Sequence, residues 1–362
     1  MNVTGAPSRP VGIKDIAKAL GVSIGTVDRA LHGRPGISPV TRKKILNMAR
    51  SLGYRPNLAA RMLSSRQERS ISITLPREIQ SFFDPLREGI AQAARSAESS
   101  GFRAEFRTYP RLGEGEIEAF EAALEQKIHG IIIVPGDPDK LKPLIRKASS
   151  RNIPVVCVAT DAPGTDRLAA VCVDPAVNGA MAAELMARFL GAQGRIAVFT
   201  GSLATTDHQQ KLEGFRRTLA SFAPAMSIAA VLETHDNEKE AYRKSTDALA
   251  ASPNIRGIYV STANSMPVLR AIGESGRANN VAVITTDLFP ELVPFIQSGV
   301  VAATIHQRPF NQGRMAFQTL QKFLVEGFTP SPVVKLAPHV VMRSNLSLFL
   351  PRERFEPENV EI

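Results

Sequence analysis

The chain has 362 residues, of which 44% are hydrophobic, and its 44 Lys and Arg against 34 Asp and Glu give a net charge of +10 at pH 7. With two cysteines it cannot be a disulfide-rich scaffold, and no stretch is long and apolar enough to predict a membrane span. The first ten residues are polar and lack the apolar centre of a signal peptide. The sequence therefore predicts a cytoplasmic protein that associates with no membrane.

The positive charge is concentrated near the N-terminus. Residues 1–69 contain 13 Lys and Arg but three Asp and Glu, an excess of +10, whereas the remaining residues contain 31 of each sign. A basic module on an electrically neutral body favours a polyanionic partner for that module alone. A solvated basic face without a partner would have the same composition, so the motif within this segment has to distinguish the two.

Residues 11–56 are predicted to form three helices. Apolar residues recur with helical spacing at Ile13, Ile16, Ala17 and Leu20. Gly21 suits the left-handed residue that ends this helix, Ser23 suits the cap of a second helix over 23–31, and Ser38 followed by proline suits the start of a third. A helix, a glycine turn and a capped helix together predict a helix-turn-helix, which places its second helix in the DNA major groove.

This N-terminal pattern resembles the LacI (lac repressor) family of bacterial regulators. The residues that carry the resemblance lie at 13–17, 21–23, 26–27, 29–31, 36–38, 41–42 and 52–57. The resemblance implies a transcriptional repressor that binds a near-palindromic double-stranded operator as a homodimer. The implied domains are a disordered tail (1–10), the helix-turn-helix domain (11–56), a hinge helix and linker (57–68), a two-lobe effector domain (69–350) and a tail (351–362). Within the effector domain, lobe 1 would take about 69–173 and 308–338, and lobe 2 about 174–307 and 339–350.

The resemblance also implies which residues contact DNA: Lys14, Ser23, Ile24, Gly25, Thr26, Arg29, Asn57 and Leu63. Arg29 would read a guanine through two hydrogen bonds, and Ile24 offers only apolar contact, for example to a thymine methyl. Gly25 would allow close approach, and Lys14, Ser23 and Thr26 would hold phosphates. Asp28 stands where many relatives have Ser, which leaves the preferred half-site open.

Asn57 is expected to cap the hinge helix, and Leu63 falls where family members insert a leucine into the minor groove. Such an apolar wedge kinks DNA at the cost of unstacking a base step. The alternative is that Leu63 is an ordinary buried residue of a linker helix.

The remainder of the chain alternates between strand and helix patterns. Candidate strands are 70–75, 102–108, 130–134, 155–159, 169–173, 195–200, 228–232, 257–260, 281–285 and 302–305. This alternation predicts α/β lobes with parallel sheets covered by helices on both faces. About 280 residues exceed one comfortable core, so two lobes are expected, with a ligand beyond the C-terminal ends of the strands.

This body resembles the periplasmic-binding-protein fold, and in places the ribose-binding proteins. The implied effector-binding residues are Gln80, Phe82, Phe83, Asp161, Asp207, His208, Asn264, Asp287 and Gln307. The two phenylalanines would pack on a sugar ring, and the amides and Asp287 would hydrogen-bond its hydroxyls. The alternatives are core packing for the phenylalanines and a helix cap for Asp287.

Two places depart from the ribose-binding pattern. Ala159 and Thr160, followed by Asp161, replace an Asp-Arg pair, and the Asp207-His208 pair replaces an Arg. The chemistry therefore suits a small neutral sugar or polyol, but the departures leave its identity open.

No spacing predicts a metal site, a cofactor or paired catalytic carboxylates, so no catalytic residue is expected. The C-terminal tail has no apolar heptads, which predicts a dimer rather than a tail-driven tetramer. Three alternatives remain: a sensor that captures sugar without regulating transcription, an extracytoplasmic sugar-binding protein, and a sugar-processing enzyme with Asp161, Asp207 or His208 as acid or base.

Overall fold

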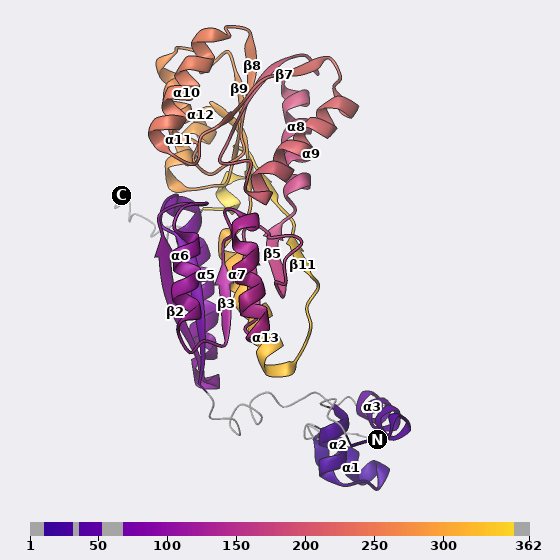
Figure 1. Cartoon of the computed structure of the whole chain (residues 1–362). Helices are drawn as coiled ribbons and strands as arrows, with labels where there is room; N and C mark the ends of the chain where they lie inside the picture. The colour runs from indigo at the N-terminus through magenta and orange to yellow at the C-terminus, as the bar shows by residue number, and fades with distance from the viewer. Residues whose placement is uncertain (1–10, 32–35, 53–67, 351–362) are drawn as a thin grey trace, which may run out of the picture. The chain divides into compact units, whose positions relative to one another are not determined.

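The computed structural model describes residues 11–31, 36–52 and 68–350, which fall into an N-terminal unit within residues 1–67 and a larger unit within residues 68–362 (Figure 1). Both expected tails, the hinge helix, and with it Asn57 and Leu63, lie outside the described residues.

The N-terminal unit is built from α1 (Ile13–Leu20), α2 (Ile24–Leu31) and α3 (Pro39–Ser51), as the sequence predicts. Gly21 ends α1 in the left-handed conformation with φ 66°. The hydroxyls of Ser23 and Ser38 accept hydrogen bonds from the amides of Thr26 and Thr41, each at 3.1 Å, and so cap α2 and α3. The three helices enclose a small core of Ile16, Ala17, Val27, Ala30, Ile45 and Ala49.

The first lobe of the larger unit contains a six-stranded parallel sheet in the order β11-β5-β4-β3-β1-β2. Its strands are β1 (Arg69–Pro76), β2 (Phe102–Tyr109), β3 (Gly130–Ile133), β4 (Val155–Val158), β5 (Ala169–Val173) and β11 (Val333–Leu336). Its helices are α5 (Gln80–Ala97), the 3₁₀ turn η1 (Glu98–Ser100), α6 (Glu116–Leu124), α7 (Pro138–Ser150) and α13 (Pro309–Glu326).

The second lobe repeats this plan with the order β12-β10-β9-β8-β6-β7, in which only β12 is antiparallel. Its strands are β6 (Gly194–Thr200), β7 (Met226–Glu233), β8 (Ile255–Val260), β9 (Ala282–Thr286), β10 (Val301–His306) and β12 (His339–Val341). Its helices are α8 (Pro175–Phe189), α9 (Thr206–Phe222), α10 (Glu238–Ala251), α11 (Met266–Glu274) and α12 (Val293–Ser298), with 3₁₀ turns η2 (Pro290–Leu292) and η3 (Leu346–Leu348).

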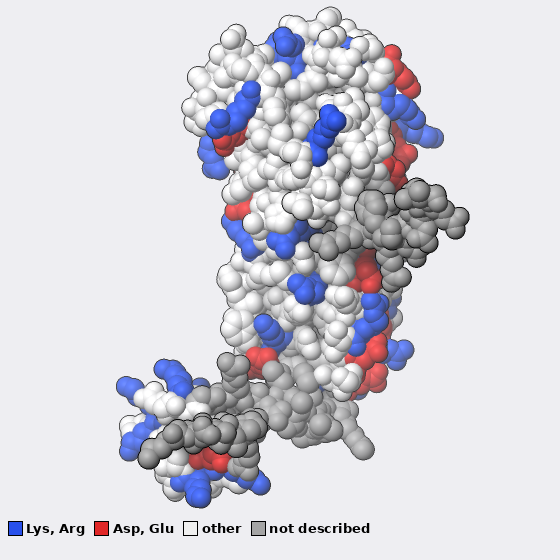
Figure 2. All heavy atoms as spheres, turned by 180° about the vertical axis from the view of Figure 1, so that it is seen from behind, with Lys and Arg blue, Asp and Glu red and all other residues white. Residues whose placement is uncertain are grey.

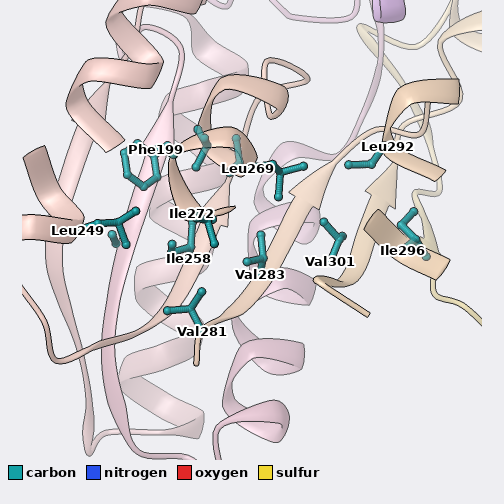
Figure 3. Packing of buried hydrophobic residues seen from close by; sticks show 14 of the residues in the cluster. Phe199, Leu249, Ile258, Leu269, Ile272, Val281, Val283, Leu292, Ile296 and Val301 are labelled. Atoms are coloured by element: carbon teal, nitrogen blue, oxygen red, sulfur yellow. The ribbon is translucent and has the colours of Figure 1, made fainter. Parts of the chain in front are cut away.

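All ten predicted strands are present, whereas β11 and β12 were not predicted. Apolar side chains of the second lobe pack between the sheet and helices α10 to α12, as the labelled residues in Figure 3 show. The parallel α/β architecture with two lobes is therefore confirmed (Figure 1).

The chain passes between the two sheets three times: between β5 and α8, between β10 and α13, and between β11 and β12. Asp174 caps α8 at the first crossing, accepting from the Val177 amide, and its carboxylate also pairs with Lys335 of β11 at 2.5 Å. Burial raises the pKa of Asp174, but the hydrogen bonds from Lys335 and Val177 outweigh burial and hold it below the usual value. Two of the three connections are thus tied together by an ion pair.

Each lobe has one pair of helices in backbone contact through glycine. In the first lobe, a Cβ on Gly89 of α5 would lie 2.0 Å from the Phe310 carbonyl oxygen of α13. In the second lobe, a Cβ on Gly179 of α8 would lie 1.9 Å from the Lys211 carbonyl oxygen of α9. A Cβ on Gly214 of α9 would lie 2.1 Å from the Ala176 carbonyl oxygen of α8. Because any side chain would force these helices apart, glycine is required for this packing.

Both cysteines, Cys157 and Cys172, are buried free thiols. Burial raises the pKa of Cys172 to about 12 and that of Cys157 further, so neither is an activated thiolate. Among residues 11–31, 36–52 and 68–350, no helix has the length and apolar character needed to cross a membrane.

Candidate DNA-reading helix and effector cleft

Helix α2 presents the residues expected to contact DNA on its exposed side. Val27 and Ala30 are buried against the other helices, whereas Ile24 is 50% exposed and Arg29 is exposed. The Nε of Arg29 donates to the Gly25 carbonyl oxygen at 3.1 Å, which holds the arginine along its own helix. The guanidinium is therefore partly positioned before any DNA is bound.

The surface of the N-terminal unit is strongly basic. Its described residues include seven exposed cations and two half-buried aspartates; the cations are Lys14, Lys18, Arg29, Arg42, Lys43, Lys44 and Arg50. Figure 2 shows Lys and Arg side chains around this small helical body, while the visible face of the larger unit mixes both signs. Such an excess of exposed cations favours binding to phosphates.

A cavity lies between the two lobes at the C-terminal ends of their parallel strands. It encloses about 430 Å³ of atom-free space, part of it open to solvent. The first lobe contributes Ile79, Phe82, Phe83, Leu112, Val134, Ala159 and Thr160, and the second contributes Thr205, Asp207, His208, Lys211, Asp236, Thr262, Ala263, Asp287 and Gln307. Six of the nine predicted effector residues therefore meet in one place.

One wall of the cavity is aromatic. Phe82 and Phe83 follow β1 in the first turn of α5, are 7% and 5% exposed, and lie edge to face with ring centroids 5.0 Å apart. Both belong to the buried face of α5 and also line the cavity, so core packing and ligand contact are not exclusive alternatives here.

Asp287 and Gln307 form a rigid polar unit on the opposite lobe. Asp287 Oδ1 accepts a hydrogen bond from the backbone amide of Gln307 at 2.9 Å, and Oδ2 accepts one from the side-chain Nε2 of Gln307 at 2.7 Å. Asp287 follows β9 and caps no described helix, since η2 begins beyond it after Phe289. Gln307 lies at the crossing from β10 to α13, so this unit couples the cavity to an interlobe connection.

The first turn of α9 contains a buried ion pair that the sequence analysis missed. Lys211 is 1% exposed, its Nζ lies 2.6 Å from Asp207 Oδ2, and it donates to the Ser261 carbonyl oxygen at 3.3 Å. The other carboxylate oxygen of Asp207 is buried without a hydrogen-bond partner. The i, i+4 spacing of Asp207 and Lys211 was a signal for the pair but not for its burial.

The beginning of α9 is hydrogen-bonded to the first lobe. Thr205 Oγ1 donates to the Gly136 carbonyl oxygen at 2.8 Å, and the Asp207 amide donates to Thr160 Oγ1 at 3.2 Å. Both bonds are buried and run between loops of different lobes. The structure is therefore one in which the lobes are closed on each other at this edge.

Buried Glu116 of α6 fixes the first-lobe loop that takes part in this contact. Its carboxylate accepts from the amides of Gly136 at 2.7 Å and Asp137 at 2.8 Å. Burial raises the pKa of Glu116, an effect that these hydrogen bonds partly offset. The loop after β3 is thereby held where its Gly136 carbonyl reaches Thr205.

Three predicted effector residues lie elsewhere. Gln80 and Asn264 line a wider groove that adjoins the cavity. Asp161 does not line the cavity. Both of its carboxylate oxygens accept hydrogen bonds from the Arg167 guanidinium, and Oδ2 lies 2.6 Å from Nη2. In this structure Asp161 is thus engaged by Arg167, six residues along the chain.

Backbone strain is concentrated at the cleft edge. Six of the eight non-glycine residues with positive φ in the described part of the chain follow strands there; they are Ile79, Ala159, His235, Asp236, Asp287 and Arg308. Left-handed backbone disfavours L side chains and persists where surrounding structure enforces it, often at ligand sites. Strain thus marks the same edge as the cavity.

Each of the two units matches the model of a known protein family. Residues 12–57 match the family model of bacterial regulatory proteins of the lacI family, and residues 71–327 match that of the periplasmic binding protein domain. The chain is similar to catabolite control protein A of Priestia megaterium, at 24% identity over 92% of this chain and 99% of the relative. It is also similar to the ribose operon repressor of Bacillus subtilis, at 26% identity over 85% of this chain and 90% of the relative.

Solved structures of solute-binding proteins share the fold of the larger unit. GanP, a glucose-galactose binding protein from Geobacillus stearothermophilus, has a TM-score of 0.70 at 26% identity and covers 77% of this chain and 99% of its own. A solute-binding protein from Bacillus halodurans C-125 with bound myo-inositol has a TM-score of 0.72 at 16% identity, over 79% and 98% of the two chains. With its helix-turn-helix unit and its two-lobe periplasmic-binding-protein domain, the chain belongs to the LacI family of bacterial regulatory proteins.

Proposed function

We propose that this protein is a DNA-binding transcriptional repressor whose affinity for its operator is switched by a small sugar or polyol held between the two lobes. The observation that carries the proposal is the cavity, which combines an aromatic wall with buried polar groups on a chain whose other unit is a basic helix-turn-helix. Such a mixture of apolar surface and a few placed polar groups is typical of small-ligand sites.

The residues of the cavity suit the two faces of a sugar. Phe82 and Phe83 would pack against the C–H face of a ring, and Asp287 and Gln307 would hydrogen-bond its hydroxyls. His208 and Asp207 would contact the part of the ligand nearest α9. Gln80 and Asn264, in the adjoining groove, would meet a larger ligand or one that is entering.

A ligand that touches both lobes would stabilise the closed arrangement that the bonds from Thr205 and Asp207 to the first lobe already form. Closure would alter the first lobe next to the hinge segment, in which Asn57 and Leu63 are proposed to form the minor-groove element. The ligand can shift DNA affinity only by the difference in its own affinity for the two states, and the coupling is reciprocal.

A thermal-shift screen of the whole chain against monosaccharides, sugar alcohols and inositols tests the ligand class. A ligand at about 100 times its Kd is expected to stabilise the larger unit by about 2.7 kcal/mol. Phe83→Ala should abolish the shift, whereas Phe222→Ala, a matched change at an exposed residue, should preserve it. Absence of any sugar or polyol hit would contradict the proposal, and recovery of a chemically altered ligand would favour an enzyme.

Arg29→Ala is expected to weaken binding to DNA selected from a random pool by about 1–3 kcal/mol and to relax base preference at one position in each half-site. Lys14→Ala should instead weaken binding to all sequences alike and lower the salt slope by about one. Repeating the selection with each variant at one stated ionic strength checks this. Unchanged base preference with Arg29→Ala would contradict the guanine-reading role.

The proposal includes a cytoplasmic homodimer on a near-palindromic operator, because one helix-turn-helix reads only a half-site. Sedimentation of the chain with and without the selected DNA measures the stoichiometry, for which two chains per operator are expected.

A further inference from the structure

The charges lining the cavity are unbalanced. Among the described residues that line it, Asp207, Asp236 and Asp287 are carboxylates and Lys211 is the one lysine or arginine. Lys211 is paired with Asp207, whose position in the first turn of α9 is further stabilised by the positive end of the helix dipole. The two lining carboxylates without a lysine or arginine partner in the described part of the chain are therefore Asp236 and Asp287, and His306 Nδ1 lies 3.7 Å from Asp287 Oδ1.

Asp236 is placed in the cavity by an unusual backbone. It follows β7 with φ 53°, directly after His235 with φ 48°, and is 7% exposed. Its Oδ1 accepts from Thr262 Oγ1 at 2.5 Å. A Cβ on Gly201 would lie 2.9 Å from Asp236 Oδ2 and 2.2 Å from the His208 ring, so the lack of a side chain at Gly201 lets both groups reach the site.

Asp207, which lines the cavity, also has an acceptor that lacks a donor. Asp207 is 7% exposed, and its Oδ1 has no hydrogen-bond partner in the described part of the chain. His208 next to it is held by its Nδ1, which lies 3.1 Å from the Ser202 amide nitrogen. A buried carboxylate oxygen without a donor favours a ligand that brings one, because an unmet acceptor is costly to bury.

The groove that adjoins the cavity adds no net positive charge to it. It is lined by the carboxylates of Glu78, Asp236, Glu238 and Glu291 but by only two cations, Arg77 and Lys239. Glu78 is paired with Arg111 at 3.1 Å, and Asp236 also lines the cavity, so the groove's own charges are Glu238 and Glu291 against Arg77 and Lys239. The excess of carboxylates therefore belongs to the cavity, where three carboxylates against one lysine favour a cationic ligand over an anionic one.

We infer that the effector is a protonated amino sugar or amino polyol, whose ammonium group is bound by Asp236 with Asp207 Oδ1 as a further acceptor. This inference rests on the proposed function and narrows its ligand class, replacing the neutral effector that the sequence predicts. Phe82, Phe83, Asp287 and Gln307 keep their roles toward the ring and its hydroxyls. The same carboxylates disfavour phosphorylated and carboxylated sugars.

Calorimetric titration of the full chain with matched sugars tests the inference. The sets are glucosamine, glucose and glucuronate, the galactose and mannose equivalents, and inosamine with inositol, all at a pH that protonates the amine. One amino member is expected to bind at least about tenfold more tightly than its neutral partner, with no binding of the acid. A neutral or acidic member that binds equally well or better overturns the inference but supports a sugar effector, whereas no binding in any set contradicts both.

Asp236→Asn is expected to weaken binding of the amino ligand by about tenfold or more and to change the Kd of its neutral partner by no more than about twofold. Asp247→Asn, the same change at an exposed residue of α10, is the control and should alter neither. In the wild-type protein, added salt should weaken binding of the amino ligand but not binding of the neutral one. Equal losses for both ligands with Asp236→Asn, or a salt-independent amino ligand, would overturn the ammonium assignment.

Discussion

Lys211→Met is expected to lower the free energy of unfolding of the larger unit by about 3–5 kcal/mol, because it leaves the carboxylate of Asp207 buried without its cation. Lys211 is 1% exposed and its Nζ lies 2.6 Å from Asp207 Oδ2, so the pair is largely shielded from bulk water. Urea unfolding followed by circular dichroism measures the change, which should appear as a lower midpoint with an unchanged slope.

The double variant Asp207→Asn with Lys211→Met should recover most of this loss, because removing both charges of a buried pair is far less costly than removing one. Lys142→Met, the same change at an exposed residue of α7, should stay within about 0.5 kcal/mol of the wild type. If the double variant were as unstable as Lys211→Met alone, the uncompensated carboxylate would not be the cause.

Gly214→Ala is expected to destabilise the second lobe by about 2–3 kcal/mol, since its Cβ would lie 2.1 Å from the Ala176 carbonyl oxygen and α8 and α9 would have to separate. Because α9 begins at the cleft with Asp207 and His208, the same variant should also weaken effector binding. Thermal unfolding with and without the sugar identified by screening measures both effects.

Gly273→Ala provides the matched control for this prediction. Gly273 lies in α11 with nothing within 4 Å of an added Cβ, so alanine there should be neutral or stabilise by up to about 1 kcal/mol. If both variants lost similar stability, the cause would be the replacement of any helix glycine, and close packing of α8 on α9 would not be the reason.

The local parts of the fold follow directly from the sequence. Helix caps at Ser23 and Ser38 and the glycine turn at Gly21 are decided by residues within one or two turns, and the structure has all three. Eight of the ten predicted strands are mostly buried, and most of these have apolar residues in succession, whereas β2 and β7, at sheet edges, are largely half-exposed. Strands β11 and β12 are also edge strands but have only four and three residues, too few to show a pattern, whereas β2 and β7 have eight each.

The cleft was only partly predictable because its polar groups depend on tertiary pairing. In the sequence, Lys211 has the pattern of a solvent-exposed helix residue, whereas packing of α9 against the sheet buries it in the structure. Asp236 reaches the cavity through left-handed backbone at two non-glycine residues, for which the sequence has no signal. Asp161 looked available, but Arg167 takes both of its carboxylate oxygens. Local motifs identified which loops meet, and pairing decided which of their side chains face a ligand.

The central claim is that ligand in the cleft changes DNA affinity, and fluorescence anisotropy of the selected operator at one fixed salt concentration tests it most directly. Titrations of the whole chain without and with saturating sugar should give Kd values that differ by about five- to 150-fold. The sugar should then show the same ratio between its Kd for the free protein and for the DNA complex. Identical DNA affinity at saturating sugar would contradict the account, even if both partners bind.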